Sequence, residues 1–202
     1  MIYKYILVCL IFIVSGCSPS SSCDKSLDFS QWHNCKGTYV LQGKGTFTGE
    51  WKHGLEHGEG RFELINGSIY IGDFEQGKLS GKGVMTSPDF RYEGEFKNNQ
   101  YNGFGFVKYS NGAEYRGQFL NNRFHGNGVY EDAEGIYTGA FREGRMHGKG
   151  VFVSSRLSKS GKNIIYKGTF INGKLDGEGE VDFGHRKMRV QFKNGKILGL
   201  DP

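Results

Sequence analysis

The sequence predicts an all-β protein: an elongated, twisted, single-layer antiparallel meander of β-hairpins. The 202 residues include 33 Gly, 16 Phe, 11 Tyr and 2 Trp but only 3 Pro. Glycine supplies the positive φ of tight turns, and aromatic side chains fill pleated faces. A pattern of glycine and aromatic residues also returns every 22 or 23 residues along most of the chain. Collagen would need glycine at every third position, and a disordered chain would lack the aromatic residues.

The first 16 residues predict a cleaved export signal. Lys4 precedes an apolar run of ten residues, from Tyr5 to Val14, which is too short for a bilayer that needs ~20 residues in a helix. The following residues, Val14-Ser15-Gly16-Cys17, resemble a bacterial lipobox. The resemblance implies cleavage after Gly16 and a diacylglyceryl, palmitate-type modification of Cys17. An ordinary secretory signal that contains a cysteine is the alternative.

The lipobox resemblance implies a lipoprotein of the bacterial cell envelope, held at a membrane by its anchor. Ser18 after the lipidated cysteine resembles the signal for the outer membrane, where the protein would face the periplasm of a Gram-negative cell. Residues 17–34 are expected to form a tether and N-terminal cap, with a flexible segment from Ser18 to Ser22. Within it, Cys23 is expected to pair with Cys35, because two thiols in an oxidising compartment usually form a disulfide.

Residues 35–199 repeat one unit, and residues 200–202 form a tail. The unit reads Tyr70-x-Gly72-x-Phe74 and then Gly81-x-Gly83. Full copies start near 47, 70, 92, 115, 137 and 166, and a partial copy starts at 188 with Val190 in the glycine position. This pattern resembles the MORN repeat (membrane occupation and recognition nexus). The resemblance implies a β-hairpin per unit and a role in interaction rather than catalysis.

Strand geometry independently favours a hairpin for each unit. Alternate side chains share a face, so Tyr70, Gly72 and Phe74 point the same way. A turn centred near Gly77 and Lys78 would place Phe74 opposite Gly81, where its ring covers bare backbone. The turn position predicts positive φ because it holds only Gly or Asn: Gly54, Gly77, Asn99, Asn122, Gly144, Gly173 and Gly195.

The two ends of the repeat array are expected to be capped by apolar residues, since a single hairpin cannot bury enough surface alone. The candidates are Leu27, Phe29 and Trp32 at one end and Ile197, Leu198 and Leu200 at the other. A homodimer contact is the alternative use of the C-terminal residues.

The sequence predicts no catalytic residue, cofactor or metal site. His57, His125 and His147 each precede a glycine pair and are interpreted as turn-filling residues. Carboxylates such as Asp73, Glu93 and Glu95 are expected on a solvated face. There is no Gly-x-Ser-x-Gly, His-Glu-x-x-His or Walker sequence, so we expect a non-enzymatic protein.

Charge is uneven along the chain. Residues 17–141 carry a net charge of −3, whereas residues 142–202 carry +7. Part of the excess lies in a Ser-rich insertion, 154–162, which predicts a basic loop with Arg156, Lys159 and Lys162. A longer solvated loop is the alternative. With no continuous basic stripe on an exported chain, nucleic acid is not an expected partner.

Three hypotheses for function follow. The leading one is a non-catalytic, membrane-anchored scaffold that binds an unidentified protein through an aromatic-lined surface. The second is binding of anionic lipid or a membrane surface through the basic C-terminal part. The third is stacking of cell-envelope glycan on the same aromatic residues. The expected binding surface comprises Tyr70, Phe74, Tyr92, Phe96, Tyr115, Phe119, Tyr137 and Phe141.

Overall fold

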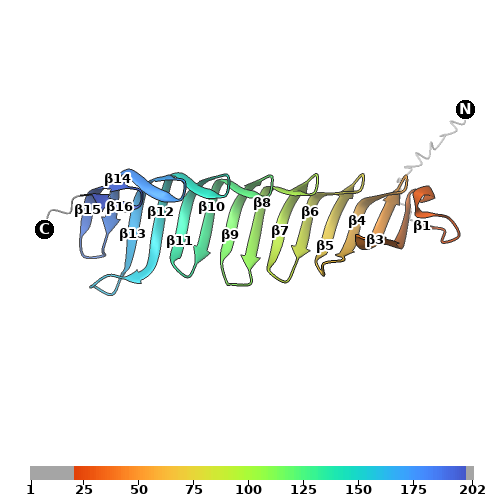
Figure 1. The fold of residues 1–202 in the computed structure, drawn as a ribbon, viewed down its shortest axis with the longest axis horizontal. Helices are drawn as coiled ribbons and strands as arrows, with labels where there is room; N and C mark the ends of the chain where they lie inside the picture. Colours follow the sequence, from red (N-terminus) through yellow and green to blue (C-terminus); the bar gives the residue numbers. More distant parts are fainter. Residues whose placement is uncertain (1–20, 199–202) are drawn as a thin grey trace, which may run out of the picture.

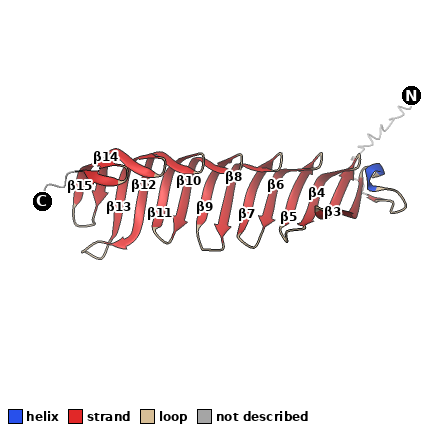
Figure 2. Ribbon diagram, viewed as in Figure 1, coloured by secondary structure: helices blue, strands red, loops and turns tan. Residues whose placement is uncertain are grey.

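The computed structural model describes residues 21–198 as one open sheet of 16 strands in chain order. Figures 1 and 2 show a long ribbon whose first and last strands lie at opposite ends. Every neighbouring pair is antiparallel except β1 and β2, which are parallel. The predicted all-β meander is therefore confirmed. The export signal, Cys17 and Leu200 lie outside the described residues.

Short strands and a single 3-10 turn, η1 (Phe29–Gln31), make up the regular structure of residues 21–198. None of the helical segments in that range is long and apolar enough to cross a membrane. The strands are β1 (Ser21–Ser22), β2 (Cys35–Leu41), β3 (Gly45–Lys52), β4 (Leu55–Leu64), β5 (Ile69–Glu75), β6 (Lys78–Thr86), β7 (Phe90–Lys97), β8 (Gln100–Tyr109), β9 (Glu114–Leu120), β10 (Arg123–Asp132), β11 (Gly135–Arg142), β12 (Arg145–Leu157), β13 (Asn163–Ile171), β14 (Lys174–Asp182), β15 (Lys187–Lys193) and β16 (Lys196–Leu198).

Two-residue turns join the strands within each repeat and lie along one long edge of the ribbon, which we call the turn edge. Both turn residues have positive φ, for example 50° at Gln76 and 75° at Gly77. This is the type I′ geometry that matches the twist of a hairpin. All seven predicted turn positions have positive φ, as expected.

The turn residues also join each repeat to the one before it. The backbone N–H of Asn99 donates to the carbonyl of Leu79 at 3.1 Å, and its side-chain Oδ1 accepts from the N–H of Leu79 at 2.8 Å. Asn122 makes the same two bonds with Tyr101. Asparagine in this position therefore provides both the turn conformation and an extra contact between repeats.

The predicted pairing of Phe74 with Gly81 is wrong. Gln76 and Gly77 form the turn, one residue earlier than expected, so Phe74 lies opposite Leu79. A bulge then shifts the register and brings Gly72 opposite Gly83.

The bulges align thirteen glycines in a single row across the sheet, each paired with the next. A Cβ added to Gly83 would lie 2.5 Å from the hydroxyl oxygen of Tyr70, so only glycine leaves room for that ring. The row consists of Gly37, Gly49, Gly60, Gly72, Gly83, Gly94, Gly105, Gly117, Gly128, Gly139, Gly150, Gly168 and Gly179, and it ends at Val190.

Aromatic rings on one face of this row form the core of the ribbon. The ring of Tyr92 packs edge-on against Phe96 of its own strand and Phe119 of the next repeat, both with centroids 5.1 Å away. Tyr115 repeats the arrangement with Phe119 and Phe141. Because each tyrosine contacts the following repeat, the core is a continuous line of rings along the long axis.

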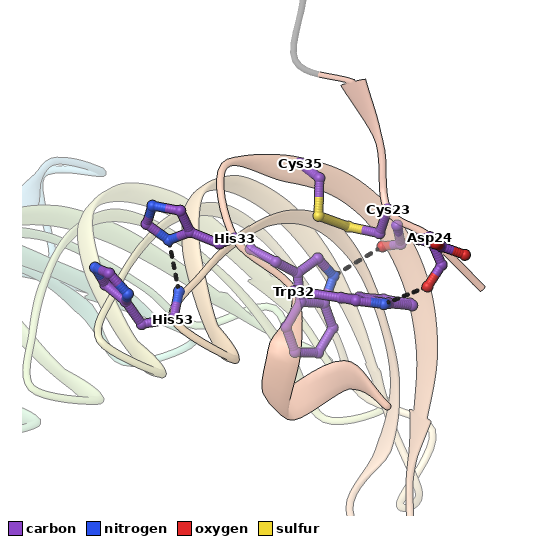
Figure 3. The surroundings of a disulfide bond; sticks show 8 residues. Cys23, Asp24, Trp32, His33, Cys35 and His53 are labelled. Carbon is purple, nitrogen blue, oxygen red and sulfur yellow. Dashed lines mark hydrogen bonds between the residues drawn. A yellow bond between two sulfur atoms is a disulfide. The ribbon is translucent and has the colours of Figure 1, made fainter. Parts of the chain in front are cut away.

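The N-terminal end is closed by a disulfide between Cys23 and Cys35, as expected from the sequence. Figure 3 shows Trp32 beside it, with its indole N–H donating to the carbonyl of Asp24 at 2.8 Å. Trp32 is buried, as its predicted capping role requires. The expected flexible tether does not extend through Ser21 and Ser22, since these residues pair with β2.

The other predicted capping residues differ in burial. Phe29 packs against Tyr39 with ring centroids 4.3 Å apart, and Ile197 packs against the core. Leu27 and Leu198 are exposed and cover little. Phe29 and Trp32 therefore cap the N-terminal end of the ribbon, and Ile197 caps the C-terminal end.

Candidate functional site

The expected aromatic binding surface is buried, which corrects the sequence-based interpretation. Its eight side chains are at most 5% exposed, and the four tyrosines are fully buried. The rings lie over the glycine row and are covered by rings of neighbouring repeats, so no partner can reach them. These residues are Tyr70, Phe74, Tyr92, Phe96, Tyr115, Phe119, Tyr137 and Phe141.

The hydroxyl groups of the buried tyrosines stabilise the fold by donating hydrogen bonds to backbone carbonyls. The Oη of Tyr92 donates to the carbonyl of Glu95 at 2.9 Å, and that of Tyr115 donates to the carbonyl of Gln118 at 2.8 Å. Burial raises the pKa of Tyr115 and of Tyr137 to about 12. Burial also raises the pKa of Tyr92, with smaller contributions from Tyr101 and Glu95. The phenols therefore remain neutral hydrogen-bond donors at physiological pH.

The opposite face of the glycine row is open and forms a shallow depression of about 940 Å³, which we call the trough. Its floor is the bare backbone of Gly105, Gly117, Gly128 and Gly139. Side chains on either side of each glycine form its walls, because residues before and after a glycine point to the face that the rings do not occupy. The walls include Glu93, Phe104, Phe106, Arg116, Asn127 and Val129.

The centre of the trough is apolar and its margin is charged. Phe104 is 62% exposed, and Val129 is also exposed. The guanidinium of Arg116 lies 4.7 Å from the centroid of the Phe106 ring, a cation–π contact, while Arg91 and Glu93 form an ion pair at 2.9 Å. A second depression shares Phe104 and Glu93 with the trough and reaches Ile71, which is 51% exposed. Phe104 thus lies between two adjoining hollows.

Sequence reasoning did not single out Phe104 and Phe106, although the signal is present. They flank Gly105 in the second half of the repeat, where the corresponding pairs in the neighbouring repeats are Lys82 with Val84 and Asn127 with Val129. Two phenylalanines at these positions point away from the line of buried rings and do not pack in it. Their departure from the repeat pattern marks an exposed surface.

The carboxylates expected on a solvated face also have a structural role. One Oε of Glu95 accepts from the backbone N–H of Phe104 at 2.9 Å, and one Oδ of Asp73 accepts from that of Lys82 at 2.9 Å. These bonds satisfy N–H groups freed by the bulges. Glu95 thereby fixes the backbone that presents Phe104.

The histidines do not fill turns, contrary to the expectation. His57, His125 and His147 are half-buried within strands β4, β10 and β12. His53 occupies a turn instead and packs against His33, with ring centroids 4.1 Å apart and the ring planes tilted by 34°. Between residues 21 and 198, no group of three or more His, Cys, Asp or Glu side chains is arranged to hold a metal ion.

The basic side chains of the insertion are exposed, but the insertion is less of a loop than predicted. It lengthens β12 to Leu157, and β13 begins at Asn163, so only 158–162 form the connection. Arg156, Lys159 and Lys162 all lie at the exposed tip of this hairpin.

The fold defines a class of protein: an open β-ribbon of hairpin repeats. A line of aromatic rings that pack over a row of glycines stabilises it. The MORN repeat matches residues 47–69, 70–90, 92–114, 115–136, 137–156 and 166–184, and the chain belongs to this family. All six predicted starting residues coincide with the starts of these matches. No curated protein shows a significant match to the chain. MORN repeats are generally modules for interaction with proteins or membranes and are typically not enzymes.

Proposed function

We propose that the protein is a non-catalytic, membrane-anchored scaffold that binds another protein through the trough around Phe104. The observation that carries this proposal is an exposed apolar strip on a face that has no packing role in the ribbon. An exposed apolar patch that is bordered by polar residues is typical of an interaction site.

The composition of the trough suits a protein partner. Interfaces have an apolar centre with aromatic and arginine residues and a polar rim. Phe104 and Phe106 supply the aromatic centre, Arg116 lies against the Phe106 ring, and the Arg91–Glu93 ion pair lies at the margin. The hollow follows the long axis, parallel to the glycine row, so an extended segment of the partner would fit along it.

The proposed anchor rests on the lipobox-like sequence at Cys17. The first described strand, β1, starts only four residues later and lies beside the disulfide-bonded cap. Attachment at this end would leave the trough, which lies near the middle of the ribbon, free for a partner in the cell envelope. The glycan hypothesis relied on the ring row, whose burial removes its support.

Photo-crosslinking in intact cells tests the proposal. A benzoylphenylalanine in place of Phe104 should yield a defined protein adduct. Leu120 provides the matched control position, because it is also an exposed apolar residue but lies beside a turn. An adduct that forms from residue 104 and not from residue 120 supports the proposal. Equal labelling from both positions, or adducts with cell-wall material alone, would contradict it.

Anionic lipid is the second candidate ligand. The specific observation in its favour is the exposed tip of the β12–β13 hairpin, which carries Arg156, Lys159 and Lys162. In Figure 1 this hairpin reaches beyond the connections next to it. This contact is compatible with protein binding in the trough, because the two surfaces involve different residues.

A further inference from the structure

The two strands beside β8 carry the same two charges in opposite orders on the face that forms the trough. Along β7 the order is Arg91 and then Glu93, and along β9 it is Glu114 and then Arg116. The strand register places Arg91 and Glu114 in one row across β8, and Glu93 and Arg116 in the next row on that face. Opposite charges therefore lie on the two sides of β8 in both rows.

These charges are too far apart to pair across β8 within one chain. Neighbouring strands lie ~4.8 Å apart, so the backbones on the two sides of β8 are separated by about 10 Å. Glu93 instead pairs with Arg91 at 2.9 Å, and Glu114 pairs with Lys108. Arg116 takes part in none of the ion pairs formed among residues 21–198. The reversed order thus has no use inside a single ribbon.

A second copy of the chain would bring the two orders together. If two ribbons pack face to face about a two-fold axis parallel to β8, the axis keeps each residue in its row and exchanges the two sides of β8. Glu93 of one copy then lies opposite Arg116 of the other, and Arg91 lies opposite Glu114. Each contact occurs twice, because a two-fold interface uses the same patch on both copies.

The apolar residues of the trough match under the same axis. Phe104 and Phe106 belong to β8 itself, so each would meet its own copy across the ~10 Å that separates packed sheets. Val84 and Val129 lie in the row of Phe106, two strands away on β6 and β10, and would face each other. The surfaces therefore match apolar side chains with apolar side chains as well as opposite charges.

The one pair of like charges on the axis is already offset. Lys108 lies in β8 and would come near its own copy, but each Lys108 forms an ion pair with Glu114 of the same chain. A foreign segment of a single charge suits this surface less well. An acidic or a basic segment would meet like charge on both sides of β8, whereas a second copy presents the charges in the reversed order.

We propose that the partner bound in the trough is a second copy of this chain, packed face to face about β8. The inference rests on the proposed function, because it names the protein that the trough binds. β8 lies near the middle of the ribbon, so the two copies would run in opposite directions along the long axis (Figure 1). The contact spans only β6 to β10, so we expect a weak association that dissociates on dilution and leaves the trough open in the dilute chain.

Photo-crosslinking between two tagged copies tests the inference with the full chain in intact cells. Two versions of the chain carry different C-terminal tags and are produced together. The first version also has benzoylphenylalanine in place of Phe106, which lies on the proposed axis. We expect an adduct that carries both tags, because residue 106 would lie against the same strand of the second copy.

Reversal of the charges tests the arrangement of the two copies. Glu93→Arg in both versions would set two cations against each other and should reduce the doubly tagged adduct about tenfold, and Arg116→Glu in both versions should do the same with two anions. Glu93→Arg in one version and Arg116→Glu in the other should restore the adduct, since every contact then joins opposite charges. Recovery would also show that both variants fold.

Glu63→Arg in both versions is the matched control. Glu63 is an exposed glutamate that pairs with Arg61 at 2.9 Å, as Glu93 does with Arg91, but it lies on β4, outside the proposed contact. This variant should leave the yield of the doubly tagged adduct unchanged.

The outcomes separate this inference from the proposed function. An adduct that contains only a different protein would overturn the inference and leave protein binding in the trough standing. Absence of any protein adduct would overturn both. A doubly tagged adduct that survives Glu93→Arg in both copies, or that the mixed pair of variants fails to restore, would overturn the proposed packing about β8.

Discussion

The ring of Tyr92 lies directly over Gly105 on the adjacent strand. A Cβ added to that glycine would be 2.5 Å from the tyrosine Oη and 2.7 Å from its Cε2. Because Gly105 has no side chain, there is space for the ring of Tyr92. The same relationship holds for Tyr70 with Gly83, Tyr115 with Gly128 and Tyr137 with Gly150.

Gly105→Ala should destabilise the protein by about 3 kcal/mol, at the upper end of the cost of overpacking, because the ring of Tyr92 has no free space to enter. Denaturant unfolding measures the loss. Gly112→Ala is the control: its φ is +89° but nothing lies within 4 Å of the added Cβ, so it carries only the ~1 kcal/mol cost of a left-handed residue. Equal losses for the two variants would refute the packing argument.

Tyr92→Phe should cost ~1 kcal/mol, because it removes the hydroxyl that donates to the carbonyl of Glu95 and leaves that buried acceptor with one bond fewer. The comparison is Tyr166→Phe, a half-buried tyrosine in β13 whose hydroxyl makes no hydrogen bond within the described part of the chain. A free energy of unfolding that falls equally in both variants would show that the bond contributes nothing.

The stability of the ribbon should fall between about pH 10 and pH 12. An unfolded tyrosine ionises near pH 10, whereas burial raises the pKa of Tyr101, Tyr115 and Tyr137 in the folded chain to about 12. In that window the folded state binds more protons, so stability decreases as pH rises. Tyrosinate absorbance and circular dichroism, followed together, check this. Ionisation of all tyrosines near pH 10 with the fold intact would contradict their burial.

Replacing Cys23 and Cys35 with serine should destabilise the N-terminal cap by about 3 kcal/mol, the chain-entropy value for a loop of this length. Since stability in a repeat array is a sum of local and nearest-neighbour contributions, protection from hydrogen exchange should drop in β2 and β3 and persist in β9 and β10. Uniform loss of protection along the ribbon would show that the array unfolds as one unit.

The repeat starts and the positive φ of one residue in each turn could be predicted from sequence because they depend on local rules, whereas the centre of the turn was placed one residue too late. A period of 22 or 23 residues placed five units, and the same motif placed the sixth after a spacing of 29 residues. The restriction to Gly or Asn identified a residue of positive φ in each turn. The disulfide followed from the two cysteines that remain after the predicted export signal and anchor. Each of these features is determined by residues close together in the chain.

The exposed face could not be predicted in the same way. Alternation along a strand shows that Tyr92 and Phe96 share a face, but not that rings of the next repeat cover them. The bulge that brings Gly94 opposite Gly105 depends on pairing between strands, which no single repeat reveals. Sequence reasoning therefore assigned the aromatic row to the surface, whereas Phe104, outside the repeat signature, is the exposed ring.

Hydroxyl-radical footprinting of the folded chain, read residue by residue, most directly tests the claim that the ring row is interior and the trough is free. We expect strong modification of Phe104 and Ile71 and almost none of Tyr70, Tyr92, Tyr115 and Tyr137 until the protein is denatured. Ready modification of those four tyrosines in the native protein, with Phe104 protected, would reverse the two faces and contradict the account.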